Sequence, residues 1–362
     1  MDPLPRHYCS LGAGPPIVVV GGGVIGLAIA RELAREGWAV TVVERGQPGA
    51  EASRAAAGMI APRVEFKHGS WLWNAGLESR RLYPRFAAEL EDETGISIDL
   101  RLSGLLVPIF SEEDETRYEP FDSDRLSARE ARELEPSLTE SLRGALLYPE
   151  DGSVDNRALI EALLASLQAR RVRLLTNTAA LEVLVDSDRV CGVSTSRGVI
   201  EACAVVNSAG AWAGDLKVPG IDLKMRPVKG HMISVQTKAL RGRPLPVRVL
   251  YSHTSYLVPR GDGRVVIGTT VEDKGFDKTV ETGQIAHLIE RARQVWPDVV
   301  QTQFVEAWTG LRPLGPEIEP RIGAAGPMGY VVAIGHYRNG ILLSPLTALR
   351  VADALSGSLA RP

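Results

Sequence analysis

The sequence predicts an α/β protein, α+β overall, in which two domains are interleaved along the chain. Its 362 residues exceed the length at which a single hydrophobic core usually stops growing. Strand and helix patterns alternate in the first part of the chain, short strands separated by turns follow, and the alternation returns near the C-terminus. We therefore expect one domain to comprise residues 15–75, 145–216 and 318–362, and the other to comprise residues 76–144 and 217–317.

The N-terminal segment carries the clearest alternation. Residues 17–20 are β-branched and fully apolar, which is typical of a parallel strand covered on both faces. Apolar positions recur at helical spacing over residues 24–36, and Gly37 is a helix stop. Residues 38–44 form a second apolar strand pattern, which completes a predicted βαβ unit.

Later segments are assigned by the same rules. The small residues of 51–62 predict a loop that runs into a helix start, and residues 71–94 have a long amphipathic helical pattern. Ser127 and Glu130 match a capping box at the start of a short helix over 127–136. The other expected elements are a strand at 104–110, a helix at 156–170 and a strand that ends at the small residues 208–210.

Composition and charge exclude several classes of protein. Lys and Arg number 41 against 44 Asp and Glu, so the net charge of -3 offers no basic patch for nucleic acid or an anionic membrane. No apolar run approaches the about 20 residues of a membrane-spanning helix, and prolines interrupt residues 1–16, where a signal peptide needs an apolar core. Cys9, Cys191 and Cys203 are too few and too scattered for a disulfide framework or a zinc site. We expect a cytoplasmic protein with small-molecule partners and no integral membrane segment.

Three glycines lie at the junction of the first strand and the first helix. In the pattern G-x-G-x-x-G, Gly21 permits a tight turn, Gly23 lets the backbone approach a pyrophosphate, and Gly26 lets the helix pack closely on the strand. The helix N-terminus adds N–H groups and a positive dipole end. Glu44 ends the next strand, where its carboxylate can accept hydrogen bonds from a ribose. The pattern predicts a Rossmann-like dinucleotide site and leaves open whether the ligand is NAD or FAD.

Two further segments carry a resemblance to a known family. "EASRAAAGMIAP" at 51–62 and "GHYRNGILLSP" at 335–345 together resemble the D-amino-acid oxidase superfamily of FAD-dependent amine oxidases, and within it most closely the glycine oxidases of thiamine biosynthesis. Shorter blocks in family order support this: "PVKGH" at 227–231, "YLVPR" at 256–260 and "WTGLRP" at 308–313. The resemblance implies a Rossmann-like FAD-binding domain built from discontinuous segments, beside a substrate domain with a mostly antiparallel sheet.

The resemblance also implies an activity. It is the oxidation of glycine by oxygen to glyoxylate, ammonia and hydrogen peroxide, with non-covalent FAD, in the formation of the thiamine thiazole. The family is commonly homo-oligomeric, so we expect a homo-oligomer. The flavin carries the chemistry in such an enzyme, and we therefore expect no catalytic side chain.

Carried over to this sequence, the resemblance implies FAD contacts from five segments. Small side chains at residues 55–58 agree with it, because a flat ring system that lies on backbone needs them. The expected contacts are Gly21, Gly23, Val24, Ile25 and Gly26 at the pyrophosphate; Glu44 and Arg45 at the adenosine ribose; Ala52 and Ser53 beside the phosphates; Ala57, Gly58 and Met59 along the flavin; Ala180 at the adenine; and Arg338, Asn339, Gly340, Ile341, Leu342 and Leu343 at the isoalloxazine edge.

The substrate end requires a group that holds a carboxylate beside the flavin. Arginine does this best, because its rigid fork forms two parallel charge-assisted bonds with a carboxylate. The resemblance assigns this role to Arg312, with Tyr256 as a second donor to the same carboxylate and Arg338 near both flavin and substrate.

Other substrates and other functions stay open at this point. Val271 and Thr254 stand where glycine oxidases often have methionine and histidine, so the pocket could admit a larger or N-methylated amine. A D-amino-acid or sarcosine oxidase or dehydrogenase is the alternative within this class. Outside this class, the alternatives are an NAD-dependent dehydrogenase and a flavin-binding protein without turnover. His231, His253 and His336 lie in separate blocks without metal-ligand spacing, and we expect no metal site.

Overall fold

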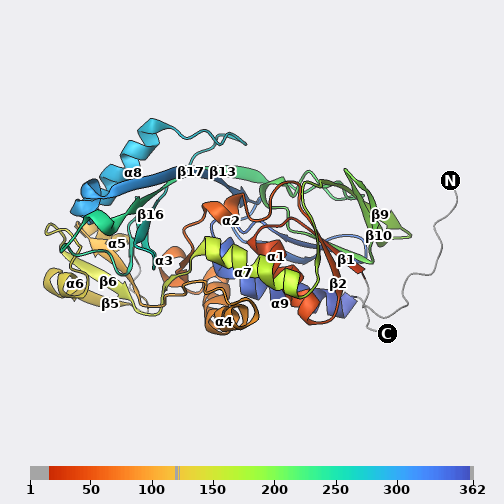
Figure 1. The fold of residues 1–362 in the computed structure, drawn as a ribbon, viewed down its shortest axis with the longest axis horizontal. Coiled ribbons are helices and arrows are strands. Elements are labelled where there is room, and N and C mark those ends of the chain that lie inside the picture. Colours follow the sequence, from red (N-terminus) through yellow and green to blue (C-terminus); the bar gives the residue numbers. More distant parts are fainter. Residues whose placement is uncertain (1–15, 119–120, 122, 359–362) are drawn as a thin grey trace.

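Two large sheets organise the protein (Figure 1), whose computed structural model describes residues 16–118, 121 and 123–358. A six-stranded sheet has the order β18-β19-β12-β1-β2-β8, and an eight-stranded sheet has the order β17-β13-β16-β15-β14-β4-β6-β5. This arrangement confirms the predicted α/β class. The expectations for residues 1–15, Cys9 included, fall outside the described residues. Of the two cysteines that the structure describes, Cys191 and Cys203, neither forms a disulfide.

The six-stranded sheet collects strands from three distant parts of the chain. Its neighbouring strands are parallel, except that β18 runs antiparallel to β19. Parallel strands end at the same edge of a sheet, so the glycine turn after β1 meets the chain that leaves β12. The strands are β1 (Pro16–Val20), β2 (Ala39–Val43), β8 (Arg173–Leu175), β12 (Ala204–Asn207), β18 (Arg321–Ala324) and β19 (Tyr330–Ile334).

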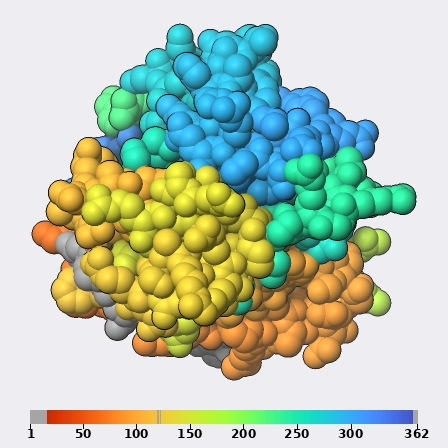
Figure 2. Space-filling view, turned by 90° about the vertical axis from the view of Figure 1, so that its left-hand side faces the viewer, coloured from red at the N-terminus to blue at the C-terminus, as the bar shows by residue number. Residues whose placement is uncertain are grey.

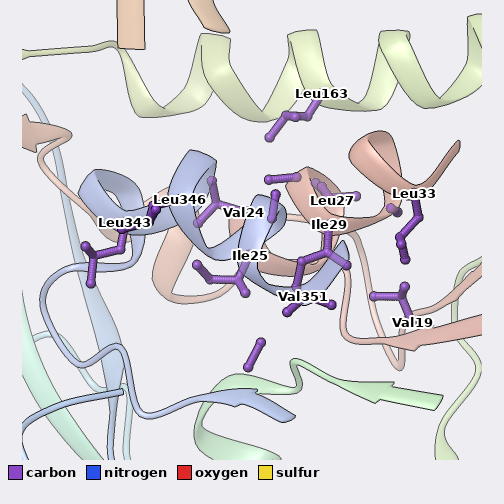
Figure 3. Packing of buried hydrophobic residues seen from close by; sticks show 14 of the residues in the cluster. Val19, Val24, Ile25, Leu27, Ile29, Leu33, Leu163, Leu343, Leu346 and Val351 are labelled. Carbon is purple, nitrogen blue, oxygen red and sulfur yellow. The ribbon is translucent and has the colours of Figure 1, made fainter. Parts of the chain in front are cut away.

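Four helices cover one face of this sheet and form the largest core. They are α1 (Val24–Arg35), α4 (Trp71–Thr94), α7 (Asn156–Ala169) and α9 (Gly340–Ser358). Side chains of α1, α7 and α9 meet there (Figure 3), and Leu27, Ile29 and Leu33 of α1 are completely buried. Full burial of each aliphatic side chain contributes about 1.5–3 kcal/mol. This core therefore fixes α1, and with it the glycine turn, against the sheet.

A small antiparallel sheet covers the opposite face. It consists of β9 (Ala180–Asp186), β10 (Arg189–Thr195) and β11 (Gly198–Glu201). Val18 of β1 packs with Val183 and Val193 of this sheet, whereas Val19 belongs to the helix-side core. The expectation from residues 17–20, a strand covered on both faces, is confirmed.

The eight-stranded sheet is antiparallel except where β4 and β14 run parallel. Its outer face is covered by α6 (Ala128–Leu134), α8 (Thr282–Val295) and the 3-10 helix η3 (Pro297–Gln301), around the buried Trp296. Figure 2 faces this end of the molecule, where the yellow chain around α6 lies against the blue chain around α8. The strands are β4 (Leu105–Ile109), β5 (Asp124–Ser127), β6 (Gly144–Tyr148), β13 (Arg226–Gln236), β14 (Val249–Tyr251), β15 (Tyr256–Pro259), β16 (Arg264–Gly268) and β17 (Gln303–Leu314).

Local sequence signals explain where the helices begin. The Ser70 hydroxyl accepts a hydrogen bond from Trp73 N at 3.2 Å at the start of α4, and the predicted capping box of Ser127 and Glu130 starts α6. Within the described residues, no helix has the length and apolar character needed to cross a membrane. The remaining elements are short: α2 (Ala52–Ala55), α3 (Pro62–Glu65), α5 (Glu112–Arg117), β3 (Met59–Ile60), β7 (Gly152–Ser153), η1 (Gly210–Trp212) and η2 (Thr237–Ala239).

Two expected domain boundaries fall inside elements. The boundary after residue 75 divides α4, although Leu72 and Leu90 of that helix are buried in the same helix-side core. The boundary before residue 145 divides β6, which pairs with β4 and β5 along its length. The domain division as a whole stays a prediction, because long-range pairing decides which sheet a strand joins and the strand's own sequence pattern does not show this.

Candidate active site

The main pocket of the described structure lies where the two sheets meet. Loops beyond the carboxyl ends of β1, β2, β12 and β19 form one half of it, which is the edge at which open α/β sheets bind ligands. Residues of the eight-stranded sheet form the other half: Gly230, Met232, Tyr256, Gly310, Leu311, Arg312 and Pro313.

The residues expected to contact a cofactor gather in this pocket, with two exceptions. Gly26 lies beneath the turn, where an added Cβ would come within 1.9 Å of the Gly21 carbonyl oxygen. Leu343 is buried in the helix-side core. The structure thus brings the five expected segments to one cavity, while the contact that each residue makes with a cofactor stays a prediction.

The glycine turn has the shape that a pyrophosphate site requires. Gly21 has φ +104, and a Cβ there would lie 2.5 Å from the Ser208 carbonyl oxygen, so a side chain is excluded. The Ser53 hydroxyl accepts from Val24 N at 2.9 Å, and the first turn of α1 carries no acidic residue. The positive end of α1 therefore faces the pocket without a competing carboxylate in its own first turn.

Glu44 holds the same turn from the end of β2. Its Oε2 accepts from Gly22 N at 2.7 Å and its Oε1 accepts from Gly46 N at 2.7 Å. Each carboxylate oxygen keeps a further lone pair that can accept from a ribose hydroxyl. Glu44 thus shapes the turn in addition to the role expected from the sequence.

The first prediction concerns Glu44. Replacing Glu44 with alanine is expected to weaken FAD binding by about 1.5–3 kcal/mol, because a charged hydrogen bond is lost and Gly22 and Gly46 lose their acceptor. Titration of the apoprotein with FAD, followed by flavin fluorescence, measures the change. Glu91→Ala on the exposed face of α4 is the matched control. FAD affinity equal to that of the wild type would contradict this placement of Glu44.

A segment of mostly small residues lines the same pocket as the glycine turn. We call Ala55 to Met59 the platform loop; all five of its residues line the pocket. Trp308 Nε1 of β17 donates to Ala55 O at 3.1 Å, and a Cβ at Gly310 would lie 2.4 Å from Ala55 Cβ. The loop therefore presents small side chains and backbone to the cavity, which a flat ring system requires.

Arg312 projects from β17 onto the bare backbone of Gly230, where an added Cβ would lie 2.2 Å from Nη2. Its Nη1 donates to Lys229 O at 3.2 Å, and its Nη2 donates to Thr270 O at 3.2 Å and to the Thr269 hydroxyl at 2.5 Å. Among the described residues, no carboxylate pairs with Arg312. A two-bond grip on a ligand carboxylate uses Nη2, so the ligand replaces at least one of its present partners.

Tyr256 and His336, which also line the pocket, stay uncharged. The Tyr256 hydroxyl donates to Met232 Sδ at 3.4 Å, and burial raises the pKa of Tyr256, so the phenol stays protonated and can donate to a ligand. Burial lowers the pKa of His336 to about 3, and its Nε2 is 3.0 Å from the Thr347 hydroxyl. His336 is therefore neutral at physiological pH and contributes no charge to the site.

Arg338 is already paired. Its Nη2 lies 2.8 Å from Glu65 Oε1, and this carboxylate raises the pKa of Arg338 above its usual range. Glu65 thus competes with any substrate carboxylate for Arg338. Arg312 has no such competing carboxylate among the described residues. The expected contact of Arg338 with substrate stays a prediction.

The structure gathers a partly buried polar cluster that the sequence spacing does not suggest. Ligand-type atoms of His231, Glu272 and Glu281 lie within 4.8 Å of one another. His231 Nδ1 is 2.9 Å from Glu272 Oε1, and His231 Nε2 accepts from Glu281 N at 3.2 Å. The ammonium of the buried Lys229 lies 3.5 Å from Glu281 Oε2 and supplies the positive charge there. Both ring nitrogens of His231 therefore already have partners, and the cluster supports the strand that carries Gly230.

Sequence reasoning did not anticipate several pocket residues, among them Trp212 and Glu65, and it emphasised two residues that lie outside the pocket. Trp212 lines the pocket beneath the Arg45 guanidinium, which lies 3.5 Å from its ring centroid. The sequence contained a signal for Trp212, because this residue follows a strand that ends beside the glycine turn. Glu65 carried no comparable signal. Val271 and Thr254, singled out as departures from the glycine oxidase pattern, do not line the pocket, and Val271 is exposed.

Comparison with known proteins identifies the family. Residues 16–354 match the family described as FAD dependent oxidoreductase. The chain belongs to this family. Membership decides between the two dinucleotides that the glycine pattern left open, and FAD is the cofactor. The pocket fits it: a glycine turn at a helix N-terminus suits the pyrophosphate, and the platform loop suits the isoalloxazine ring.

Relatives within this FAD-dependent family match nearly the whole chain. The chain is 38% identical to the glycine oxidase of Geobacillus kaustophilus over 352 residues, which cover 93% of this chain and 92% of that protein. It is 37% identical to the glycine oxidase of Pseudomonas aeruginosa over 348 residues, 94% of each. It is also 36% identical over 345 residues to the bifunctional protein ThiO/ThiG of Trichormus variabilis, of which it spans about half the length, 52%.

A solved structure confirms the fold. The crystal structure of glycine oxidase from Geobacillus kaustophilus superimposes with a TM-score of 0.89 at 37% sequence identity and covers 96% of this chain and 97% of that one. The expected combination of a Rossmann-like FAD-binding fold with a mostly antiparallel second sheet is thereby confirmed.

Proposed function

We propose that this flavoprotein oxidises glycine with oxygen and water to glyoxylate, ammonia and hydrogen peroxide. The observation that carries the proposal is Arg312, a guanidinium in the flavin pocket with no carboxylate partner among the described residues. An α-amino acid supplies the missing carboxylate. The names of the relatives that share nearly the full chain favour glycine as that amino acid.

Each residue at the substrate end has a defined task in this proposal. FAD, when bound, supplies the redox chemistry, since it takes two electrons from the substrate and passes them to oxygen. Arg312 holds the carboxylate and Tyr256 donates a second hydrogen bond to it, so that the α-carbon is oriented toward the platform loop. Met232 and the burial of Tyr256 keep this end of the pocket apolar, which strengthens the ion pair with Arg312.

The proposal extends to the setting of the enzyme. We place it in the formation of the thiamine thiazole, on the strength of the sequence resemblance and the relative named ThiO/ThiG. The cytoplasmic location and the homo-oligomeric state expected from the sequence are part of the same proposal. A D-amino acid or sarcosine is the alternative substrate.

Two measurements test the proposed function. Denaturation of the purified yellow protein is expected to release FAD, identified by chromatography of the supernatant; recovery of NAD, or of no nucleotide, would contradict the assignment. A peroxide assay over glycine, sarcosine, D-alanine and L-alanine, with catalase as the control, is expected to give glycine the highest kcat/KM. A higher value for another amine would replace glycine as the substrate while leaving the carboxylate site intact.

A further inference from the structure

Arg260 is a buried arginine that the proposed reaction does not use. It directly follows β15, and its exposed fraction is 5%. Its one ion-pair contact within the described residues is a long one, 3.9 Å from Nε to Asp155 Oδ2. Burial lowers the pKa of Arg260 to about 10. A charge buried in this way needs hydrogen-bond partners to be tolerated.

The partners of Arg260 are neutral oxygens beside the flavin pocket. Its Nη2 donates to Ala57 O of the platform loop at 2.7 Å and to Asn156 Oδ1 at 3.2 Å. Its Nη1 donates to Val154 O at 2.9 Å. One guanidinium from the eight-stranded sheet thus links the platform loop to the start of α7, which packs on the other sheet.

The contact that Arg260 spans is crowded. Val154 N donates to Gly58 O at 2.8 Å, and Gly58 has φ +72, where an added Cβ would lie 2.2 Å from Val154 O. Asn156 Nδ2 donates to Ser53 O at 2.8 Å and to Arg54 O at 3.0 Å. Hydrogen bonds from Val154 and Asn156 therefore hold the backbone of the platform loop and of the residues just before it, and Arg260 supplies a donor to the Ala57 carbonyl oxygen.

We propose that Arg260 is a positioning residue that holds the platform loop at the height at which the isoalloxazine ring of FAD lies on it. The inference rests on the proposed placement of the flavin along this loop. An arginine fork reaches all three oxygens at once, whereas a lysine ammonium is a point donor and methionine donates nothing. Without the fork, Ala57 O and Val154 O are buried without this donor, and the loop relaxes toward solvent or cavity.

The test compares Arg260→Met and Arg260→Lys with a matched control, Arg264→Met. Arg264 lies on the adjoining strand β16, and its side chain bonds to carboxylates: Asp262 at 2.6 Å and Asp155 at 3.4 Å. The Arg264→Met variant therefore removes the same charge from the same hairpin and leaves the contacts of the platform loop unchanged. Three quantities are measured for each variant: the FAD dissociation constant of the apoprotein, the visible circular dichroism of bound flavin and the thermal midpoint of the holoenzyme.

The expected result separates positioning from general stability. Arg260→Met is expected to bind FAD at least about tenfold more weakly and to alter the visible circular dichroism of the flavin, with Arg260→Lys in between and Arg264→Met close to the wild type. A folded Arg260 variant with wild-type FAD affinity and dichroism overturns the proposal. So does a failure of both Arg260 variants to fold, because Arg260 would then stabilise the whole fold. None of these readouts depends on glycine turnover. If glycine proves not to be the substrate, the peroxide assay shows this, and the test of Arg260 is unaffected.

Discussion

Replacing Arg312 with alanine is expected to leave FAD bound and to lower kcat/KM for glycine by about 2–5 kcal/mol, roughly 30-fold to several thousandfold. The substrate carboxylate would enter the pocket without its cation, and the desolvation of that charge would go uncompensated. Arg312→Lys is expected to recover only part of the loss, because a point charge does not reproduce a two-bond fork. Flavin reduction by glycine under anaerobic conditions measures the effect.

The same experiment with ethylamine tests the reason for the loss. Ethylamine has no carboxylate, so its reduction of the flavin is expected to change little in either Arg312 variant. Arg226→Ala is the matched control, since Arg226 begins β13, the neighbour of β17, and pairs at the surface with Asp273. Equal losses on glycine and ethylamine would mean that Arg312 serves the fold or the flavin. Arg338, released from Glu65, would then become the candidate for the carboxylate.

Replacing Gly26 with alanine is expected to abolish FAD retention and to destabilise the protein by about 3 kcal/mol or more, the upper range for an overpacked core. The added methyl would lie 1.9 Å from the Gly21 carbonyl oxygen and 2.7 Å from Ser208 Oγ, so α1 must move away from β1 and from the pyrophosphate site. Thermal unfolding and the flavin content of the purified protein measure both effects.

Gly283→Ala is the control for the Gly26 variant. Gly283 lies in the first turn of α8, and an added Cβ there meets nothing within 4 Å. The control is expected to unfold at the wild-type temperature or slightly above it, because alanine favours the helix. A Gly26→Ala protein that purifies with stoichiometric FAD would show that α1 need not approach the turn so closely.

Short-range signals in the sequence were sufficient for most individual elements. Ser127 and Glu130 lie three residues apart, and their capping box requires nothing beyond the helix it starts. The helix pattern over 71–94 matches α4, and Gly21 and Gly23 lie between β1 and α1, whereas Gly26 lies in the first turn of α1. These signals act between residues that are close in the sequence, where neighbours set the backbone geometry.

Pairing between distant segments was beyond such signals. The expected boundary before residue 145 falls inside β6, because its partners, β4 and β5, are recognised only when the sheet is assembled. Glu65 and Arg338 are 273 residues apart, and their ion pair changes which arginine is free to hold a substrate. Arg260 was visible in the "YLVPR" block, but its three oxygen partners come from the segments around residues 57 and 155.

By itself, the sequence determined the dinucleotide turn, the family resemblance and the arginine proposed to bind the carboxylate, because each depends on residue type at short spacing. The tertiary structure alone decided the charge balance of the pocket. Among the described residues no carboxylate pairs with Arg312, whereas Glu65 pairs with Arg338, and Glu44 accepts a hydrogen bond from the glycine turn in addition to its expected role at the ribose. Charges interact over a few ångströms of space whatever their separation along the chain, so the fold must be assembled before their partners are known.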